Sequence, residues 1–337
     1  MRGRGINYDT GFFPGGKDSR PGFNADDARR EMRIIADDLH CTAVRISGGG
    51  PERIAIAARH AGDAGLEVWF APFPCELAPE KLLTLYLDCA ERAEAIRVTG
   101  VEVVLVLGCE SSLFASGFIP GDDVYQRIET LMNGGPELWS QLGRMTGELN
   151  DFLARTVALV RTRFGGRVTY ASGTWEQIDW EPFDIVAVDA YRDVNNAAAY
   201  RDELREQFRH GKPVAVTEFG CSTYVGAADK GGLGWAIVDD RADPPQLDGD
   251  YTRSEQEQVT YLRDLLAVFD DEGVDSAFWF TFAAFDAPHR PDDPRRDLDM
   301  AGYGTVKMLA GEHGTAYPDL RWEPKKVFHA LAAAYAS

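Results

Sequence analysis

The sequence predicts a single (β/α)8 barrel over residues 1–337, and two observations support this fold class. Short apolar runs alternate with amphipathic stretches along the whole chain, which is the element order of a barrel of parallel strands. Two of these runs, 101–109 and 213–217, lead directly into glutamates, Glu110 and Glu218. Functional groups of such barrels lie at the carboxyl ends of the strands, so the acids indicate a site there.

The strands are predicted from apolar runs rich in β-branched and aromatic residues, because a parallel strand in a barrel is buried on both faces. A doubly wound open sheet is the alternative fold. It calls for a G-x-G-x-x-G motif after the first strand, which Gly15-Gly16 does not supply. The eight strands are expected at 5–8, 42–46, 67–73, 101–109, 167–172, 185–191, 213–219 and 276–282.

Capping signals place the helices. Asn24 is a typical N-cap, Pro51 suits the first position of a helix, and Thr252 with Glu255 matches a capping box. Long loops are expected at 111–135, 221–251 and 286–319. The helices are expected at 25–39, 51–65, 83–96, 138–164, 197–209, 252–269 and 324–335, the last of which should pack on the barrel wall.

The charge of the chain limits its partners. It has 35 basic and 54 acidic residues, a net charge of −19. Nucleic acids and anionic membranes are bound through basic faces, so we expect neither as a partner. A small neutral carbohydrate or glycoside meets no such electrostatic penalty. The oligomeric state stays open.

The chain start and the cysteines indicate a cytoplasmic protein. Residues 1–6 contain no apolar segment of a signal peptide, and no run of eighteen apolar residues occurs. The cysteines are odd in number and show no C-x-x-C spacing, which favours reduced thiols. They are Cys41, Cys75, Cys89, Cys109 and Cys221.

Glu110 and Glu218 form the central hypothesis about function. Strands four and seven lie across the mouth of an eight-stranded barrel, so acids at their ends can converge. A retaining glycosidase uses two carboxyls about 5–5.5 Å apart, one as nucleophile and one as acid and then base. The alternative is a pair of structural glutamates held in ion pairs.

On these motifs the chain resembles the clan A, cellulase-like superfamily of retaining glycoside hydrolases on (β/α)8 barrels. The matching pieces are Arg45, Glu110, Tyr191, 217–220, Trp279 and the tail 322–331. The resemblance implies that Glu218 is the nucleophile and Glu110 the acid/base. It further implies that Arg45 and Tyr191 hold the nucleophile's carboxylate, and that Trp279 forms the floor beneath the sugar.

One position departs from that superfamily. An asparagine that contacts the sugar 2-hydroxyl usually precedes the acid/base, and here the residue is Cys109. A thiol is a poor hydrogen-bonding partner. Either another side chain such as Asn7 makes this contact or the substrate lacks the usual group. Trp175, just after strand five, is expected to line the cleft, while Asp189 is expected inside strand six without a catalytic role.

Other interpretations were weighed. Residues 4–12, 42–47 and 108–110 resemble actinobacterial proteins labelled abortive phage infection proteins, so a carbohydrate-binding or phage-defence protein with altered catalysis is an alternative. A phosphosugar enzyme using the glycine-rich loop at 226–235 is another. The six histidines fall in predicted helices or loops, and no strand ends on lysine, so neither a metal nor another cofactor is expected. No G-x-S-x-G motif occurs.

Overall fold

Eight parallel strands form the barrel, and they follow the order β5-β4-β3-β2-β1-β10-β7-β6. The two ends of this sheet meet at Ser172, which forms a parallel bridge with Val188. There the Ser172 N–H donates to the Ala187 carbonyl at 3.1 Å, and the Asp189 N–H donates to the Ser172 carbonyl at 2.9 Å. The strands are β1 (Gly3–Asp9), β2 (Ala43–Gly48), β3 (Glu67–Pro72), β4 (Val103–Cys109), β5 (Arg167–Ala171), β6 (Val186–Asp189), β7 (Val214–Phe219) and β10 (Ser276–Trp279).

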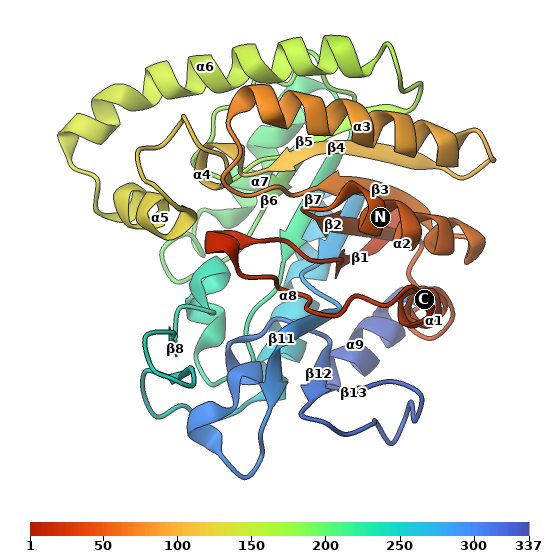
Figure 1. Ribbon diagram of the computed structural model, residues 1–337. Coiled ribbons are helices and arrows are strands. Elements are labelled where there is room, and N and C mark those ends of the chain that lie inside the picture. Colours follow the sequence, from red (N-terminus) through yellow and green to blue (C-terminus); the bar gives the residue numbers. More distant parts are fainter. Residues whose placement is uncertain (337) are drawn as a thin grey trace.

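Helices surround this barrel in the computed structural model, which describes residues 1–336 (Figure 1). The predicted single-domain (β/α)8 barrel is thus confirmed, while residue 337 lies outside the described residues. The long helix α6 runs beside α3 on one flank (Figure 1). The main helices are α1 (Ala25–Asp37), α2 (Pro51–Asp63), α3 (Pro79–Arg97), α6 (Pro136–Val160), α7 (Tyr200–Gln207), α8 (Glu255–Glu272) and α9 (Lys326–Tyr335).

Side chains alternate along each strand between two buried layers. One layer fills the inside of the barrel and the other packs between strands and helices. Trp69 and Phe278 belong to the inner layer, with ring centroids 4.7 Å apart. Ile6, Val44 and Trp279 belong to the outer layer. This alternation decides which strand residues can reach the site at the barrel mouth.

Two of the three capping predictions are confirmed. The Asn24 side chain accepts hydrogen bonds from the N–H groups of Asp26 and Asp27, and Pro51 is the first residue of α2. The predicted Thr252 cap is wrong, because α8 is capped by Ser254, whose hydroxyl accepts from the Glu257 N–H. Thr252 is held in extended backbone by the Val225 N–H, which donates to its carbonyl at 2.9 Å, so the helix starts later.

The three predicted loops are wrong in part, because each contains regular structure. Residues 111–135 include α4 (Ser111–Phe114) and α5 (Val124–Asn133), and Asp123 caps the second of these helices. Residues 221–251 include the short hairpin of β8 (Val238–Asp239) and β9 (Gln246–Leu247). Residues 286–319 contribute to a separate sheet made of β11 (Ala283–His289), β12 (Val306–Leu309) and β13 (Trp322–Pro324).

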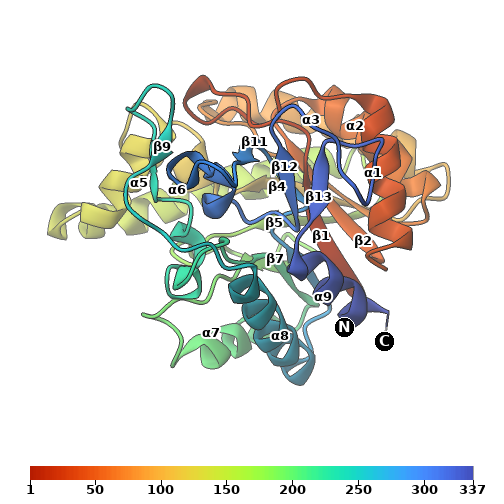
Figure 2. The same ribbon diagram turned by 90° about the horizontal axis from the view of Figure 1, so that it is seen from below.

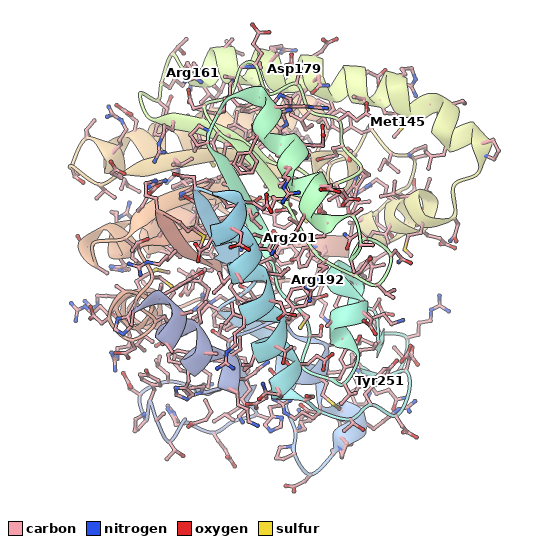
Figure 3. The ribbon with its side chains drawn as sticks, turned by 180° about the vertical axis from the view of Figure 1, so that it is seen from behind. Met145, Arg161, Asp179, Arg192, Arg201 and Tyr251 are labelled. Atoms are coloured by element: carbon pink, nitrogen blue, oxygen red, sulfur yellow. The ribbon has the colours of Figure 1, made fainter. Side chains whose placement is uncertain are left out.

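The C-terminal helix α9 packs on the barrel beside α8, as the sequence predicts for the tail helix. The Tyr335 hydroxyl on α9 donates to the Gly5 carbonyl of β1 at 3.1 Å. Both termini consequently lie on the same side of the molecule (Figure 2). On the back face α7 and α8 pack side by side, and Arg201 bridges them by ion pairs with Asp271 and Glu272 at 3.1 Å (Figure 3).

No helix within residues 1–336 is both long and apolar enough to cross a bilayer. All five cysteines are free. The cytoplasmic location stays a prediction.

Candidate active site

Glu218 lies at the carboxyl end of β7 with its carboxylate held by two donors. Arg45 Nη1 lies 2.6 Å from Glu218 Oε1, and the Tyr191 hydroxyl donates to Glu218 Oε2 at 2.9 Å. Glu218 is 7% exposed and Arg45 is 1% exposed, so this is a buried ion pair reached from the barrel mouth. The two contacts fix the position of both carboxylate oxygens of Glu218.

A β-bulge turns Glu218 into the barrel. Simple alternation from Ala215, an inner-layer residue, would point Glu218 outward toward the helices. However, Val216 and Phe219 pair with Ala277 and Trp279, so the two residues Thr217 and Glu218 oppose one residue of β10. The extra residue shifts the register, and Glu218 faces inward while Phe219 faces the helices.

A second bulge brings Cys109 into the same group. Val106 and Cys109 of β4 pair with Thr169 and Ala171, which leaves one extra residue on β4. Gly108 absorbs this irregularity with a φ of +89°. A Cβ at this position would lie 2.3 Å from the Tyr86 hydroxyl, so only glycine fits. Cys109 consequently belongs to the inner layer of the barrel.

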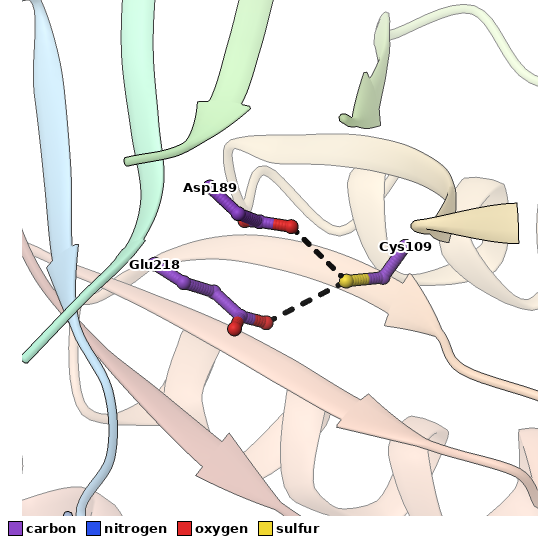
Figure 4. A group of neighbouring side chains, drawn as sticks. All are labelled: Cys109, Asp189 and Glu218. Carbon is purple, nitrogen blue, oxygen red and sulfur yellow. Dashed lines mark hydrogen bonds between the residues drawn. The ribbon is translucent and has the colours of Figure 1, made fainter. Parts of the chain in front are cut away.

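The Cys109 thiol lies between two carboxyl groups (Figure 4). Its Sγ is 3.3 Å from Asp189 Oδ2 and 3.6 Å from Glu218 Oε1. Asp189 is the last residue of β6, so it belongs to the mouth and not to the strand interior as predicted. Burial and the charge of Glu218 raise the pKa of Asp189, and burial together with both carboxylates raises the pKa of the Cys109 thiol. Both groups are therefore favoured in their protonated, neutral forms.

Asn7, on β1, supports the ion pair between Arg45 and Glu218. Its Oδ1 accepts from Arg45 Nη1 at 2.8 Å, and its Nδ2 donates to the Thr217 carbonyl at 2.9 Å. Asn7 is 1% exposed. Its two amide atoms thus contact protein groups, and its geometry orients Arg45 toward Glu218.

Glu110 follows β4 with a left-handed backbone of φ 43° and ψ 46°. This conformation is uncommon outside glycine, costs of order 1–3 kcal/mol, and clusters at functional sites. The Glu110 carbonyl accepts from the N–H groups of Leu113 and Phe114, and no residue among 1–336 hydrogen-bonds to its side chain. Burial raises the pKa of Glu110 well above its usual range, and the charges of Asp189 and Glu218 add to this shift.

Trp175 lies beside the mouth rather than in the group around Glu218. Its Nε1 donates to the Ser112 hydroxyl at 3.1 Å, and it lines a small crevice with Met145 and Leu149. The neighbouring Glu176 accepts from the Tyr170 hydroxyl at 2.9 Å and from the Ser112 N–H at 3.0 Å. These bonds hold the loop that follows β5 against α4.

Trp279 lies in the outer layer, away from the mouth. It is 0% exposed, packs edge-on against Phe219 at 5.5 Å between ring centroids, and donates to the Tyr303 carbonyl at 3.2 Å. The next residue, Phe280, is only partly buried, and its ring centroid lies 6.4 Å from that of Tyr191. The structure therefore brings Phe280 to the nucleophile side, a residue that the sequence analysis missed and that strand alternation could have found.

The glycine-rich loop after β7 forms part of the same wall. A Cβ on Gly232 would lie 3.2 Å from the Tyr191 ring, and the Tyr303 hydroxyl donates to the Gly231 carbonyl at 2.6 Å. Lys230 is exposed. These glycines permit close packing on the two tyrosines, which gives the loop a structural role beside the site.

Among residues 1–336, two groups of side chains have the composition of a metal site. Ligand atoms of Cys109, Asp189 and Glu218 lie within 4.8 Å of one another, but the Arg45 guanidinium already occupies Glu218 and opposes a cation. The other group is His289, Asp297 and Asp299. Its carboxylates pair with cations of the protein, since Arg253 contacts both aspartates and Lys325 lies 2.9 Å from Asp299.

No model of a known protein family matches the chain, and no curated protein matches it in sequence. Solved structures do match. A GH113 β-1,4-mannanase aligns over 100% of both chains at 14% identity and a TM-score of 0.63. The GH113 β-mannanase of Alicyclobacillus acidocaldarius aligns over 99% of this chain and 97% of its own at 16% identity and 0.60. The β-glycosidase of Thermosphaera aggregans aligns over 98% and 95% at 8% identity and 0.53.

The chain therefore shares the fold of (β/α)8 glycoside hydrolases. At these identities the likeness establishes the fold alone. The resemblance to the proteins labelled abortive phage infection proteins has no counterpart in these comparisons and stays a prediction.

Proposed function

We propose that this protein is a retaining glycoside hydrolase in which Glu218 is the nucleophile and Glu110 the acid/base. The observation that carries the proposal is the state of Glu218. It is a buried strand-end carboxylate, paired with Arg45 and oriented by Tyr191, at the mouth of a barrel whose fold is that of glycoside hydrolases. A structural glutamate in an ion pair would not require a bulge to turn it into the mouth.

In the first step a Glu218 oxygen attacks the anomeric carbon and the bond from that carbon to the leaving oxygen breaks. Glu110 transfers its proton to the leaving oxygen, so the leaving group departs as an alcohol. A raised pKa suits Glu110 to this role, because the carboxyl must be protonated before the reaction. In the second step Glu110 takes a proton from water, the resulting hydroxide attacks the anomeric carbon, and Glu218 is released.

The neutral forms of Asp189 and Cys109 fit the same scheme. If both were ionised beside Glu218, three negative charges would share one guanidinium, which low-dielectric surroundings disfavour. When Asp189 and Cys109 are both protonated, the only charged groups in this cluster are Arg45 and Glu218, which neutralise each other. The nucleophile then keeps its charge while its neighbours do not compete for the arginine.

The test is hydrolysis of α- and β-linked 4-nitrophenyl glycosides of several hexoses by the wild type and two variants. Glu218→Gln should lose at least about 10⁴-fold in kcat, because the nucleophile is gone. Glu110→Gln should lose about 10²–10⁴-fold on alkyl glycosides but much less on 4-nitrophenyl glycosides, whose leaving oxygen needs no proton. The control is Glu102→Gln, a largely exposed glutamate preceding the same strand, which should leave kcat unchanged.

Sodium azide gives a second readout. In Glu218→Gln it should restore turnover by attacking the anomeric carbon in place of the carboxylate, and the product should be a glycosyl azide. Activity in the wild type that survives Glu218→Gln would refute the proposed roles. Sugar binding without turnover in any protein would instead favour the alternative of a carbohydrate-binding protein on this barrel.

A further inference from the structure

The two sides of the barrel mouth differ in chemistry. On the side of β7 the nucleophile meets polar groups, Arg45 and Tyr191. On the side of β1, β3 and β4 the side chains are aromatic. The rings of Phe12 and Phe73 are stacked, with centroids 5.1 Å apart and an interplanar angle of 4°, and Phe114 meets Phe73 edge-on at 4.6 Å. We call Phe12, Phe73 and Phe114 the aromatic wall.

The aromatic wall adjoins the acid/base. Phe114 lies one helical turn after Glu110, and its N–H donates to the Glu110 carbonyl at 3.0 Å. Phe12 and Phe114 are partly buried and pack against the inner layer that contains Cys109. The wall therefore adjoins the backbone turn that carries Glu110. Two further aromatic side chains are exposed nearby in the chain, Phe13 after Phe12 (38% exposed) and Tyr125 on α5 (44% exposed), which lies against Gly15.

Two acidic groups next to the aromatic wall, Asp9 and Glu76, already have partners. Asp9 accepts from the Gly11 N–H at 2.7 Å and from the Ser19 hydroxyl at 2.6 Å. Glu76 accepts from the Val124 N–H at 2.8 Å and pairs with Arg127. A ligand on this side thus meets mainly ring faces. Sugar hydroxyls buried there would lose hydrogen bonds to water without replacement, which is unfavourable.

We propose that the leaving group of the substrate is an apolar alkyl or aryl aglycone that lies against Phe12 and Phe114, and is not a second sugar. The inference rests on the proposed function, because the general acid protonates the leaving oxygen and the surface beside it receives the leaving group. The polar side around Arg45, Glu218 and Tyr191 then receives the sugar. The enzyme would release a monosaccharide and a hydrophobic alcohol.

The test is a series of ethyl, butyl, hexyl and octyl glycosides of whichever sugar the wild type accepts, beside disaccharides of the same sugar. The acidity of the leaving alcohol is nearly constant from ethyl onward, so differences report contacts with the chain. Each buried methylene should raise kcat/KM by about two- to fourfold until the wall is covered. Phe114→Ala should flatten this rise, so that the ratio of kcat/KM for the octyl glycoside to that for the ethyl glycoside falls toward one.

The outcomes separate the two proposals. A flat alkyl series with faster cleavage of disaccharides would overturn the apolar aglycone and leave the glycosidase intact. Turnover of no glycoside would overturn the proposed function and this inference with it. Because the rise is measured first in the wild type, a Phe114→Ala protein that fails to fold does not remove the test. In that case Phe12→Ala is the second variant.

Discussion

Replacing Arg45 with methionine tests the buried ion pair directly. Methionine keeps much of the length of the arginine side chain but removes its charge, so Glu218 and Asn7 each lose a partner. The change leaves a carboxylate in a site where its own side chain is 9% exposed. The expected result is a large loss of folding stability at pH 7 that depends on the presence of the Glu218 charge.

The magnitude follows from the geometry. Breaking a buried ion pair by removing one partner costs about 3–5 kcal/mol. Coulomb's law gives an attraction between the two charges of about 4 kcal/mol, for charge centres roughly 4 Å apart and an effective dielectric constant of 20. Arg45 Nε and Nη2 have no hydrogen-bond partner among residues 1–336, and removing them offsets part of the loss. We therefore expect a decrease in unfolding free energy of about 3 kcal/mol.

Urea unfolding followed by tryptophan fluorescence measures this quantity in a double-mutant cycle. In the Glu218→Gln background, Arg45→Met should cost less than about 1 kcal/mol, because no buried charge is left unpaired. Arg45→Lys is the matched control, since it keeps the charge and should cost less than Arg45→Met. An equal cost of Arg45→Met in both backgrounds would refute the view that the pair accounts for the loss.

Three further predictions concern the other groups of the site. Asp189→Asn should be more stable than the wild type, by a free energy of unfolding that grows from pH 4 to pH 8. Burial raises the pKa of Asp189 in the folded protein, so the wild type loses stability as the pH rises above the pKa of the unfolded chain, whereas asparagine does not titrate. The alkaline limb of kcat/KM should reflect deprotonation of Glu110, lie above the usual carboxyl range, and disappear in Glu110→Gln. Trp279→Ala should cost about 3–5 kcal/mol of stability, whereas Phe280→Ala should lower kcat/KM by up to about tenfold with a smaller stability loss.

Each of these has a clear contrary result. A stability difference between Asp189→Asn and the wild type that stays constant from pH 4 to pH 8 would mean that Asp189 has no raised pKa. An alkaline limb that persists unchanged in Glu110→Gln assigns it to another group. If Phe280→Ala leaves kcat/KM unchanged and a folded Trp279 variant has a lower kcat/KM, Trp279 lies beneath the sugar, as the family resemblance implies.

The barrel and the principal acids were predictable from sequence because they depend on local patterns. Continuous apolar runs identify buried parallel strands, and an acid directly after such a run is not explained by packing. Glu218, Arg45 and Tyr191 do converge as expected. The pairing of Glu218 with Arg45 could be predicted only through the family resemblance, since the two residues lie far apart in the chain.

Two different physical causes account for the errors, namely shifted strand register at two bulges and neglected alternation at Trp279. Bulges at Gly108 and at Thr217 each insert one residue, so simple alternation fails at the strand ends that carry the site. Trp279 was expected in the site because tryptophan suits a sugar-binding floor, yet it faces the helices and Phe280 faces Tyr191. The pairing of Cys109 with Asp189 depends on the first bulge and has no sequence signal of its own.

The most direct measurement is mass spectrometry of the protein after reaction with an activated 2-deoxy-2-fluoro glycoside of the accepted sugar. The fluorine slows both steps, and the activated leaving group keeps the first step fast enough for the covalent intermediate to accumulate. We predict a mass increase of one fluoroglycosyl group on the peptide that contains Glu218, absent in Glu218→Gln. A label on any other carboxylate, or steady turnover of the reagent without a covalent species, would contradict the assignment of Glu218 as the nucleophile.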